Sequence, residues 1–157
     1  MKNKTAAVWL TFLLGPLGIH RRYLLDRFDL LGYLLPIPTL LGAYGVYRAR
    51  SLGVDDVLSW VLMPLLGFTL AGCALNAIVY GLQSTETWNK RFNPNAPPES
   101  AAGSTHWLTV FGLAIALLIG TTALMASLAF SIQHYFEAQM EQAAAAPAAE
   151  WTRKPAG

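Results

Sequence analysis

The sequence predicts an all-α integral membrane protein with four helical spans, and the number and placement of its charged residues carry this prediction. Only 13% of the 157 residues are charged, against about 25% in a typical soluble domain, and the mean hydropathy is +0.39. The charges lie in short clusters that separate four charge-free windows, residues 5–20, 30–47, 57–85 and 100–136. Because a charge at the centre of a bilayer costs about 2.5–3.5 kcal/mol, a bilayer selects this layout.

The first window is short, which predicts an irregular N-terminal hairpin over residues 1–51 with spans at about 5–20 and 30–50. At a rise of about 1.5 Å per residue, the first window reaches roughly 24 Å, less than the roughly 30 Å of hydrocarbon in a bilayer. It also contains Pro16. The sequence leaves open whether this hairpin crosses fully or re-enters on one side.

The second window is interrupted by Pro36 and Pro38. Proline lacks a backbone donor and disfavours helix in the residue before it. We therefore expect a short helix near 28–35, a break, and a new helix that opens at Pro38 and runs to about Arg50.

The third window predicts a regular span within residues 52–82. Asp55 or Asp56 is placed to cap a helix that begins at Val57, since a carboxylate accepts from the free N–H groups of a first turn. The charge-free stretch that follows, to about Gly81, exceeds the roughly 20 residues that a crossing needs.

The fourth window predicts a span within residues 106–146, beginning near Thr105 and leaving the lipid at about Ile132. The stretch that follows is rich in Ala, Gln and Glu, so we expect it to continue as a protruding helix. Pro147 is expected to end that helix, and residues 147–157 to form a disordered tail.

A polar linker, residues 83–105, joins the third and fourth spans. Its segment 93–98 holds three prolines and is expected to be exposed and extended. Trp88 and Phe92 are expected to rest at the lipid surface. An even number of spans places both termini on one side, and the basic residues divide too evenly to choose which side.

A local motif lies between the first two windows, at Gly15, Gly18, His20, Arg21 and Tyr23, with Leu24 after it. The chain resembles the TM-two family of two-transmembrane domains over about residues 1–50, since that family carries Gly-x-x-Gly-x-His/Asp-Arg-Phe-Tyr-Leu-Gly. It departs from the family where Arg22 and Leu25 stand for Phe and Gly. The resemblance implies a helical membrane hairpin with a basic turn, and it implies no enzyme activity.

The residues of this motif also have a physical interpretation of their own. Gly15 and Gly18 allow a tight turn, and His20, Arg21 and Arg22 are then expected at the level of the lipid headgroups, where guanidinium groups bind phosphates. The nearby acidic residues are expected to pair with neighbouring arginines, Asp26 and Asp29 with Arg22 or Arg27. An ordinary charged turn at the membrane surface and a partner-binding switch both fit this pattern.

Small residues recur at four-residue spacing in the last two windows, at Gly112, Ala116 and Gly120 and at Gly67 and Ala71. Such stripes allow two membrane helices to approach closely. They fit packing of the third span on the fourth, and they also fit dimerisation with a second copy of the chain.

Two side chains inside the third window have chemistry of their own. Asn76 is expected to hydrogen-bond to a neighbouring helix, at Thr121 or Thr122, while a transport site at Asn76 is the alternative. Cys73 is the single cysteine, and in this setting it is expected to be a buried packing residue.

These features predict a non-catalytic membrane adaptor or assembly protein without cofactor or metal, and a small transporter or channel subunit is the alternative. The three histidines lie at window edges without a second ligand at metal-binding spacing. The net charge of +2 and the paired basic residues do not indicate a nucleic-acid partner. We expect the partners to be the lipid bilayer and another membrane protein or a second copy, in a bacterial inner (plasma) membrane.

Overall fold

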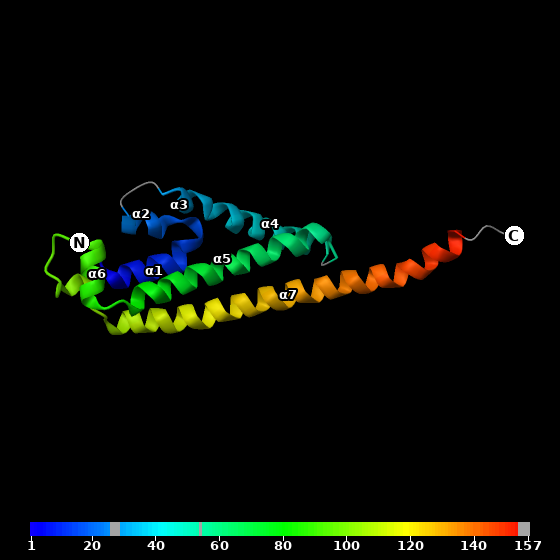
Figure 1. Cartoon of the computed structure of the whole chain (residues 1–157). Helices are drawn as coiled ribbons and strands as arrows, with labels where there is room; N and C mark the ends of the chain where they lie inside the picture. Colours follow the sequence, from blue (N-terminus) through cyan, green and yellow to red (C-terminus); the bar gives the residue numbers. More distant parts are fainter. Residues whose placement is uncertain (26–28, 54, 154–157) are drawn as a thin grey trace.

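The computed structural model describes residues 1–25, 29–53 and 55–153, and every regular element within these ranges is helical. The elements in chain order are α1 (Lys4–Leu14), η1 (Gly15–Leu17), α2 (Ile19–Leu25), α3 (Leu30–Leu34), α4 (Pro36–Leu52), α5 (Val57–Leu82), α6 (Thr85–Phe92), η2 (Ala101–Gly103) and α7 (Trp107–Arg153). The long helices α5 and α7 lie antiparallel along the molecule, with α1 and α4 on different halves of α5 (Figure 1).

Within the described ranges, three segments are long and apolar enough to cross a membrane, by length and composition. They are Leu30–Leu52, Val57–Leu82 and Ala101–Ala144. The predicted all-α fold class is therefore confirmed. The prediction of four spans is not confirmed, because the first window forms only a shorter apolar helix, Lys4–Leu17, before the chain turns.

Small residues hold α5 and α7 together. A methyl group added at Gly120 would lie 2.6 Å from the Cβ atom of Ala74, and one added at Gly67 would collide with the side chain of Ser127. Ala116 is fully buried in the same interface. Packing of the third span on the fourth, one of the two explanations for the small-residue stripes, therefore describes the contact between α5 and α7.

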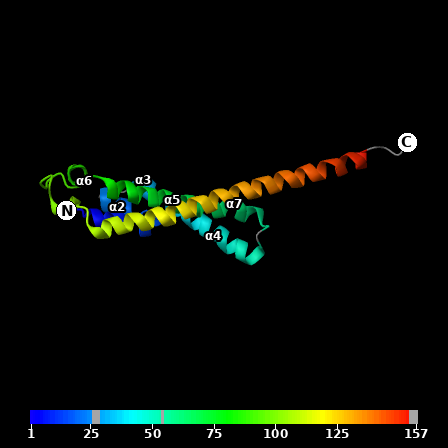
Figure 2. The same cartoon turned by 90° about the horizontal axis from the view of Figure 1, so that it is seen from below.

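A second small-residue contact joins α4 to α5. Methyl groups added at Gly42 and Gly45 would lie 2.5 Å from the backbone nitrogen of Leu66 and 2.6 Å from the Cβ atom of Leu62. The backbone of α4 therefore lies directly on α5. Seen from below, α4 and α7 diverge beyond the region where both lie against α5 (Figure 2).

The start of α5 is fixed by Asp56, which confirms the predicted cap. Its carboxylate accepts hydrogen bonds from the backbone nitrogen of Ser59 over 3.0 Å and from the Ser59 hydroxyl over 2.6 Å. Arg48 at the end of α4 donates to both carboxylate oxygens over 2.8 Å. These bonds hold the pKa of Asp56 well below its usual range.

The break in the second window falls at Leu35, between α3 and α4, as the prolines predict. However, α4 begins at Pro36 and not at Pro38. A proline fits the first turn of a helix, where its missing N–H group has no intrahelical partner to lose. The whole segment Leu30–Leu52 consequently remains almost continuous helix.

The first window does not run straight, because the chain doubles back at Gly18. The Nζ atom of Lys2 donates to the carbonyl oxygen of Leu24 over 2.5 Å, and the backbone nitrogen of Asn3 donates to the hydroxyl of Tyr23 over 3.0 Å. The start of α1 and the end of α2 therefore lie at the same end of the molecule (Figure 1). The segment from α1 to α2 thus starts and ends at the same end of the molecule.

The polar linker contains α6, and its aromatic residues correct a prediction. Trp88 is fully buried and Phe92 nearly so, in a cluster with Ala7 and Leu24. They do not rest at an outer surface, because the indole nitrogen of Trp88 donates to the carbonyl oxygen of Lys2 over 3.0 Å and draws the ring beneath the N-terminal segment.

The last helix corrects the predicted C-terminal boundary. α7 continues through Pro147 to Arg153, whereas the sequence predicted that Pro147 would end it. Alanines precede and follow this proline, and alanine has the highest helix propensity of all residues. Of the predicted disordered tail, residues 154–157 lie outside the described part of the chain.

Candidate functional site

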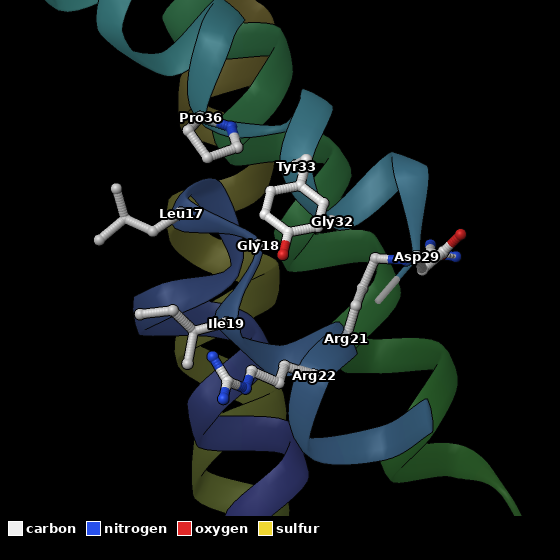
Figure 3. A pocket seen from close by; sticks show the side chains of 9 residues that line it. All are labelled: Leu17, Gly18, Ile19, Arg21, Arg22, Asp29, Gly32, Tyr33 and Pro36. Carbon is white, nitrogen blue, oxygen red and sulfur yellow. Dashed lines mark hydrogen bonds and ion pairs between the residues drawn. The ribbon is translucent and has the colours of Figure 1, made fainter. Parts of the chain in front are cut away.

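The family-like motif occupies the sharp turn between α1 and α2 and packs against α3 (Figure 3). Gly18 has a φ of 76°, a conformation that side chains disfavour. A methyl group there would also collide with the carbonyl oxygen of Gly32. The Thr39 hydroxyl of α4 donates to the carbonyl oxygen of Pro16 over 2.8 Å, which fixes the turn from the other side.

An ion pair joins α2 to the start of α3. The Nε atom of Arg21 donates to a carboxylate oxygen of Asp29 over 2.6 Å, and the guanidinium Nη2 atom also contacts this oxygen. The sequence had assigned Asp29 to Arg22 or Arg27, but the reversal at Gly18 brings Arg21 to it instead. The predicted pairing of Asp26 or Arg27 lies outside the described residues.

A pocket of about 190 Å³ opens beside this ion pair, between α2 and α3. The Arg21–Asp29 ion pair lines one side of it, and the Arg22 side chain extends along the other side, beside Ile19 (Figure 3). The remainder is mainly apolar. Its other lining residues are Leu17, Gly18, Ile19, Gly32, Tyr33 and Pro36.

His20 is not at the headgroup surface as the sequence had predicted. It is 2% exposed and faces the interior, near Gly15 and Cys73, because the reversed helix α2 directs that side chain toward α5. Its Nδ1 atom has no hydrogen-bond partner in the described part of the chain. Cys73 is itself buried, as predicted.

Tyr23 ties the motif to the N-terminus. It is half-buried beside the cluster of Leu24, Trp88 and Phe92, and its hydroxyl accepts the hydrogen bond from Asn3. The motif residues thus lie in two environments. The Arg21 side chain lines the pocket, whereas the side chains of His20 and Tyr23 point into the folded protein.

The predicted helix-packing residues do not form a single interface. Gly67, Ala116 and Gly120 lie between α5 and α7. Gly112 contacts α1 instead, because a methyl group there would lie 3.3 Å from the Trp9 indole. Ala71 lines a shallow apolar groove of about 340 Å³ that α5 and α7 form on their outer side.

Asn76 corrects a further prediction. It is exposed, and no hydrogen bond of its side chain is found within the described ranges. The hydroxyls of Thr121 and Thr122 donate to backbone carbonyl oxygens of their own helix, over 2.6 Å and 2.7 Å. The Asn76 side chain therefore does not join α5 to α7.

Sequence reasoning missed the polar contacts that hold the N-terminus. Lys4 is fully buried, and its Nζ atom donates to the carbonyl oxygen of Gln83 over 2.9 Å and to the Thr105 hydroxyl over 2.6 Å. Asn93 accepts from the backbone nitrogen of Lys2 over 2.6 Å and donates back to its carbonyl oxygen over 3.0 Å. Nothing in the local sequence marks these partners, which lie up to 101 residues apart.

The small residues of α4 were also missed. Gly42 and Gly45 stand three apart, so both lie on the face of α4 that packs against α5. This spacing was the signal that could have found them.

Side chains that could hold a metal ion are not gathered in the described part of the chain. No three His, Cys, Asp or Glu side chains lie close enough there to hold a metal ion. A scan against models of protein families found no match. Searches of curated proteins and of solved structures also found no match. The resemblance of residues 1–50 to the TM-two family therefore stays a prediction.

Proposed function

We propose that this protein is a non-catalytic, multi-pass membrane adaptor or assembly factor of a bacterial inner (plasma) membrane. The observation that carries the proposal is the length of α7 relative to the rest of the fold. His134 on α7 stacks on Trp60, one turn into α5, with ring centroids 4.1 Å apart. Beyond that contact α7 continues to Arg153 and extends past the rest of the described body (Figure 1).

The extension and its base expose surface that a partner could contact. From residue 138 to Arg153 it adds about 24 Å of helix at a rise of about 1.5 Å per residue. Near its base, Tyr135, Phe136 and Met140 are all at least 59% exposed. Large exposed apolar side chains of this kind are typical of surfaces that contact another protein or a membrane boundary. Another membrane protein, or a second copy of the chain, is the partner we propose.

The proposed arrangement has three crossings, made within the segments Leu30–Leu52, Val57–Leu82 and Ala101–Ala144, together with a re-entrant hairpin of α1 and α2. The polar contacts of Lys2 with Asn93 support it, since they hold the N-terminus beside the linker. An odd number of crossings puts Lys2 and the end of α7 on opposite sides.

The alternative, a small transporter or channel subunit, draws less support. Such proteins place polar groups along a path between helices. Asn76 was the candidate for that role, and it lies on the exposed face of α5 and not between α5 and α7.

Site-specific photo-crosslinking in native membranes tests the adaptor proposal. A photoreactive residue at Met140 reports on the extension, and one at Val110, which is exposed on the apolar part of α7, serves as the matched control. We expect protein adducts of defined mass at Met140, and lipid adducts alone at Val110.

Absence of protein adducts from Met140, at labelling efficiency equal to that at Val110, would contradict the proposal. Co-expression of two differently tagged copies identifies the partner class, because a second copy gives a doubly tagged adduct.

A further inference from the structure

We infer that the extension of α7 lies on the extracytoplasmic side of the membrane, and that the end of the molecule holding the N-terminus and α6 faces the cytoplasm. The partner that binds the extension must then present an extracytoplasmic segment. This inference rests on the three crossings of the proposed function. It adds the absolute orientation and the compartment in which the partner is met, neither of which the charge layout of the sequence decides.

Several segments that carry basic residues are bonded together at one end of the molecule. The Nζ atom of Lys2 donates to the carbonyl oxygen of Leu24 at the end of α2. The indole nitrogen of Trp88 in α6 donates to the carbonyl oxygen of Lys2. Lys4 belongs to the same end, because its Nζ atom donates to the carbonyl oxygen of Gln83, directly after α5. The N-terminus, the end of α2 and α6 therefore share one side, called here the linker side (Figure 1).

The loop between α4 and α5 lies at the opposite end of α5. Arg48, near the end of α4, donates to both carboxylate oxygens of Asp56, which caps the first turn of α5. The 26 residues of α5 separate this cap from Gln83 by about 39 Å at a rise of about 1.5 Å per residue. That length exceeds the roughly 30 Å of hydrocarbon in a bilayer. The two ends of α5 therefore lie on opposite sides of the membrane in the proposed arrangement.

The basic residues are divided unequally between these two sides. Among the described residues close to the ends of the spans, six lie on the linker side and two on the other. They are Lys2, Lys4, Arg21, Arg22, Lys90 and Arg91 on the linker side, and Arg48 and Arg50 opposite. Arg153 stands about 20 residues beyond Ile132, at the limit of the range within which such charges set orientation. Counting it still leaves six against three.

The reversal of the chain at Gly18 causes this imbalance. If the first window crossed the membrane, Arg21 and Arg22 would lie opposite Lys2 and Lys4, and each side would hold four of the eight residues near the spans. Because the chain doubles back, the two pairs add to each other. Cytoplasmic loops carry an excess of Lys and Arg, and this excess sets the orientation of the protein. The linker side is therefore the cytoplasmic side.

The side on which α7 ends follows from this orientation. The segment before α7 is held on the linker side, since the Nζ atom of Lys4 donates to the Thr105 hydroxyl over 2.6 Å. His134 of α7 stacks on Trp60, near the start of α5 and so at the end of the molecule that holds Arg48. The helix beyond that contact leaves the membrane on the extracytoplasmic side, and a partner reaches it there.

Labelling of single cysteines in intact bacterial cells tests the orientation. The full chain with Cys73→Ala carries one cysteine at a time, at the exposed positions Asn95→Cys in the linker and Gln142→Cys in the extension, or in a short tag before Met1. A small membrane-impermeant maleimide reaches only extracytoplasmic thiols in intact cells, and labelling after permeabilisation gives the maximum for each variant. We expect nearly complete labelling of Gln142→Cys, and almost none of Asn95→Cys or of the tag.

The labelling pattern separates failure of the orientation from failure of the three crossings. If Asn95→Cys and the tag are labelled and Gln142→Cys is protected, the orientation is overturned while the three crossings and the proposed function stand. A tag that differs from Asn95→Cys in accessibility would contradict the three crossings themselves. Equal accessibility of Asn95→Cys and Gln142→Cys would contradict the crossing by α7.

A charge-balanced variant tests the cause of the orientation. Lys90→Gln and Arg91→Gln remove two charges from the linker side, and Ser51→Lys and Leu52→Lys add two at exposed positions on the other side. Four basic residues then stand against four. We expect labelling of Asn95→Cys in intact cells to rise from almost none to about half of its maximum, because the bias that selects one orientation is gone.

The matched control exchanges the same two positions without changing their charge, as Lys90→Arg with Arg91→Lys. It should keep Asn95→Cys protected, as in the parent chain. Complete protection of Asn95→Cys in the charge-balanced variant as well would overturn the charge imbalance as the cause of the orientation.

Discussion

Gly18 shows how a single residue sets the direction of the chain. It combines a φ of 76° with contact against the Gly32 backbone, so a side chain there meets both strain and a collision. Gly53 has a φ of 99°, but a methyl group there would meet no described atom within 4 Å. The two positions therefore separate conformational strain from steric overlap.

We expect Gly53→Ala to lower the free energy of unfolding by roughly 1–3 kcal/mol, because its φ of 99° and ψ of 167° lie in a region that is essentially restricted to glycine. Gly18→Ala should cost more than about 3 kcal/mol, because the Gly32 carbonyl group must also move. Unfolding of the detergent-solubilised variants by titration with a denaturing detergent measures both values. Equal losses at the two positions would show that the contact with Gly32 is unimportant.

Asp56 makes stability depend on pH. The pKa of Asp56 is lowered in the folded state, so the folded protein binds fewer protons than the unfolded chain at acidic pH. Its contribution is present above the ordinary pKa of an aspartate and is lost as pH falls through the lowered folded-state value.

The melting temperature of the wild type should therefore fall more between pH 7 and pH 3 than that of Asp56→Asn, which keeps a capping side chain but not the charge. Asp55→Asn is the control, because Asp55 is exposed and Asp56 makes the cap. A pH response in Asp56→Asn as large as that of the wild type would contradict this assignment.

At the scale of elements, the helices with local signals were predictable. The start of α5 followed from Asp56, and the break before α4 followed from its prolines. The burial of α6 was not predictable, because its Trp88 ring is held by Lys2, 86 residues away in sequence. The direction of α2 likewise depends on how Gly18 packs on α3, which no local pattern encodes.

The contact of α4 with α5 yields a prediction at this scale. Gly42→Leu should lower the free energy of unfolding by about 3 kcal/mol, at the upper end of ordinary overpacking, because its side chain meets the α5 backbone. Gly72→Leu on α5 is the matched control, since a methyl group at Gly72 meets no described atom within 4 Å. The same detergent titration compares them, and similar losses in both variants would argue against close packing of α4 on α5.

At the scale of the whole molecule, the sequence correctly predicted an all-helical protein, and three of its helical segments are long and apolar enough to cross a membrane. The charge layout alone could not show which windows form those segments. The windows that form long helices and the one that doubles back are all free of charge. The difference lies in contacts: Lys2 is bonded to Asn93, so the N-terminus lies beside the linker that joins α5 to α7. A four-crossing chain would separate these two sites by the full bilayer.

The most direct test is therefore a map of sidedness in sealed membranes. A Cys73→Ala background carries an epitope tag before Met1 and, one at a time, the exposed positions Asn95→Cys, Ser51→Cys and Gln142→Cys. A membrane-impermeant maleimide labels the cysteines, and protease removes the tag only from its own side. We expect the tag to share a side with Asn95, and Ser51 and Gln142 to share the other. A tag on the same side as Ser51 would contradict the re-entrant hairpin and restore four crossings.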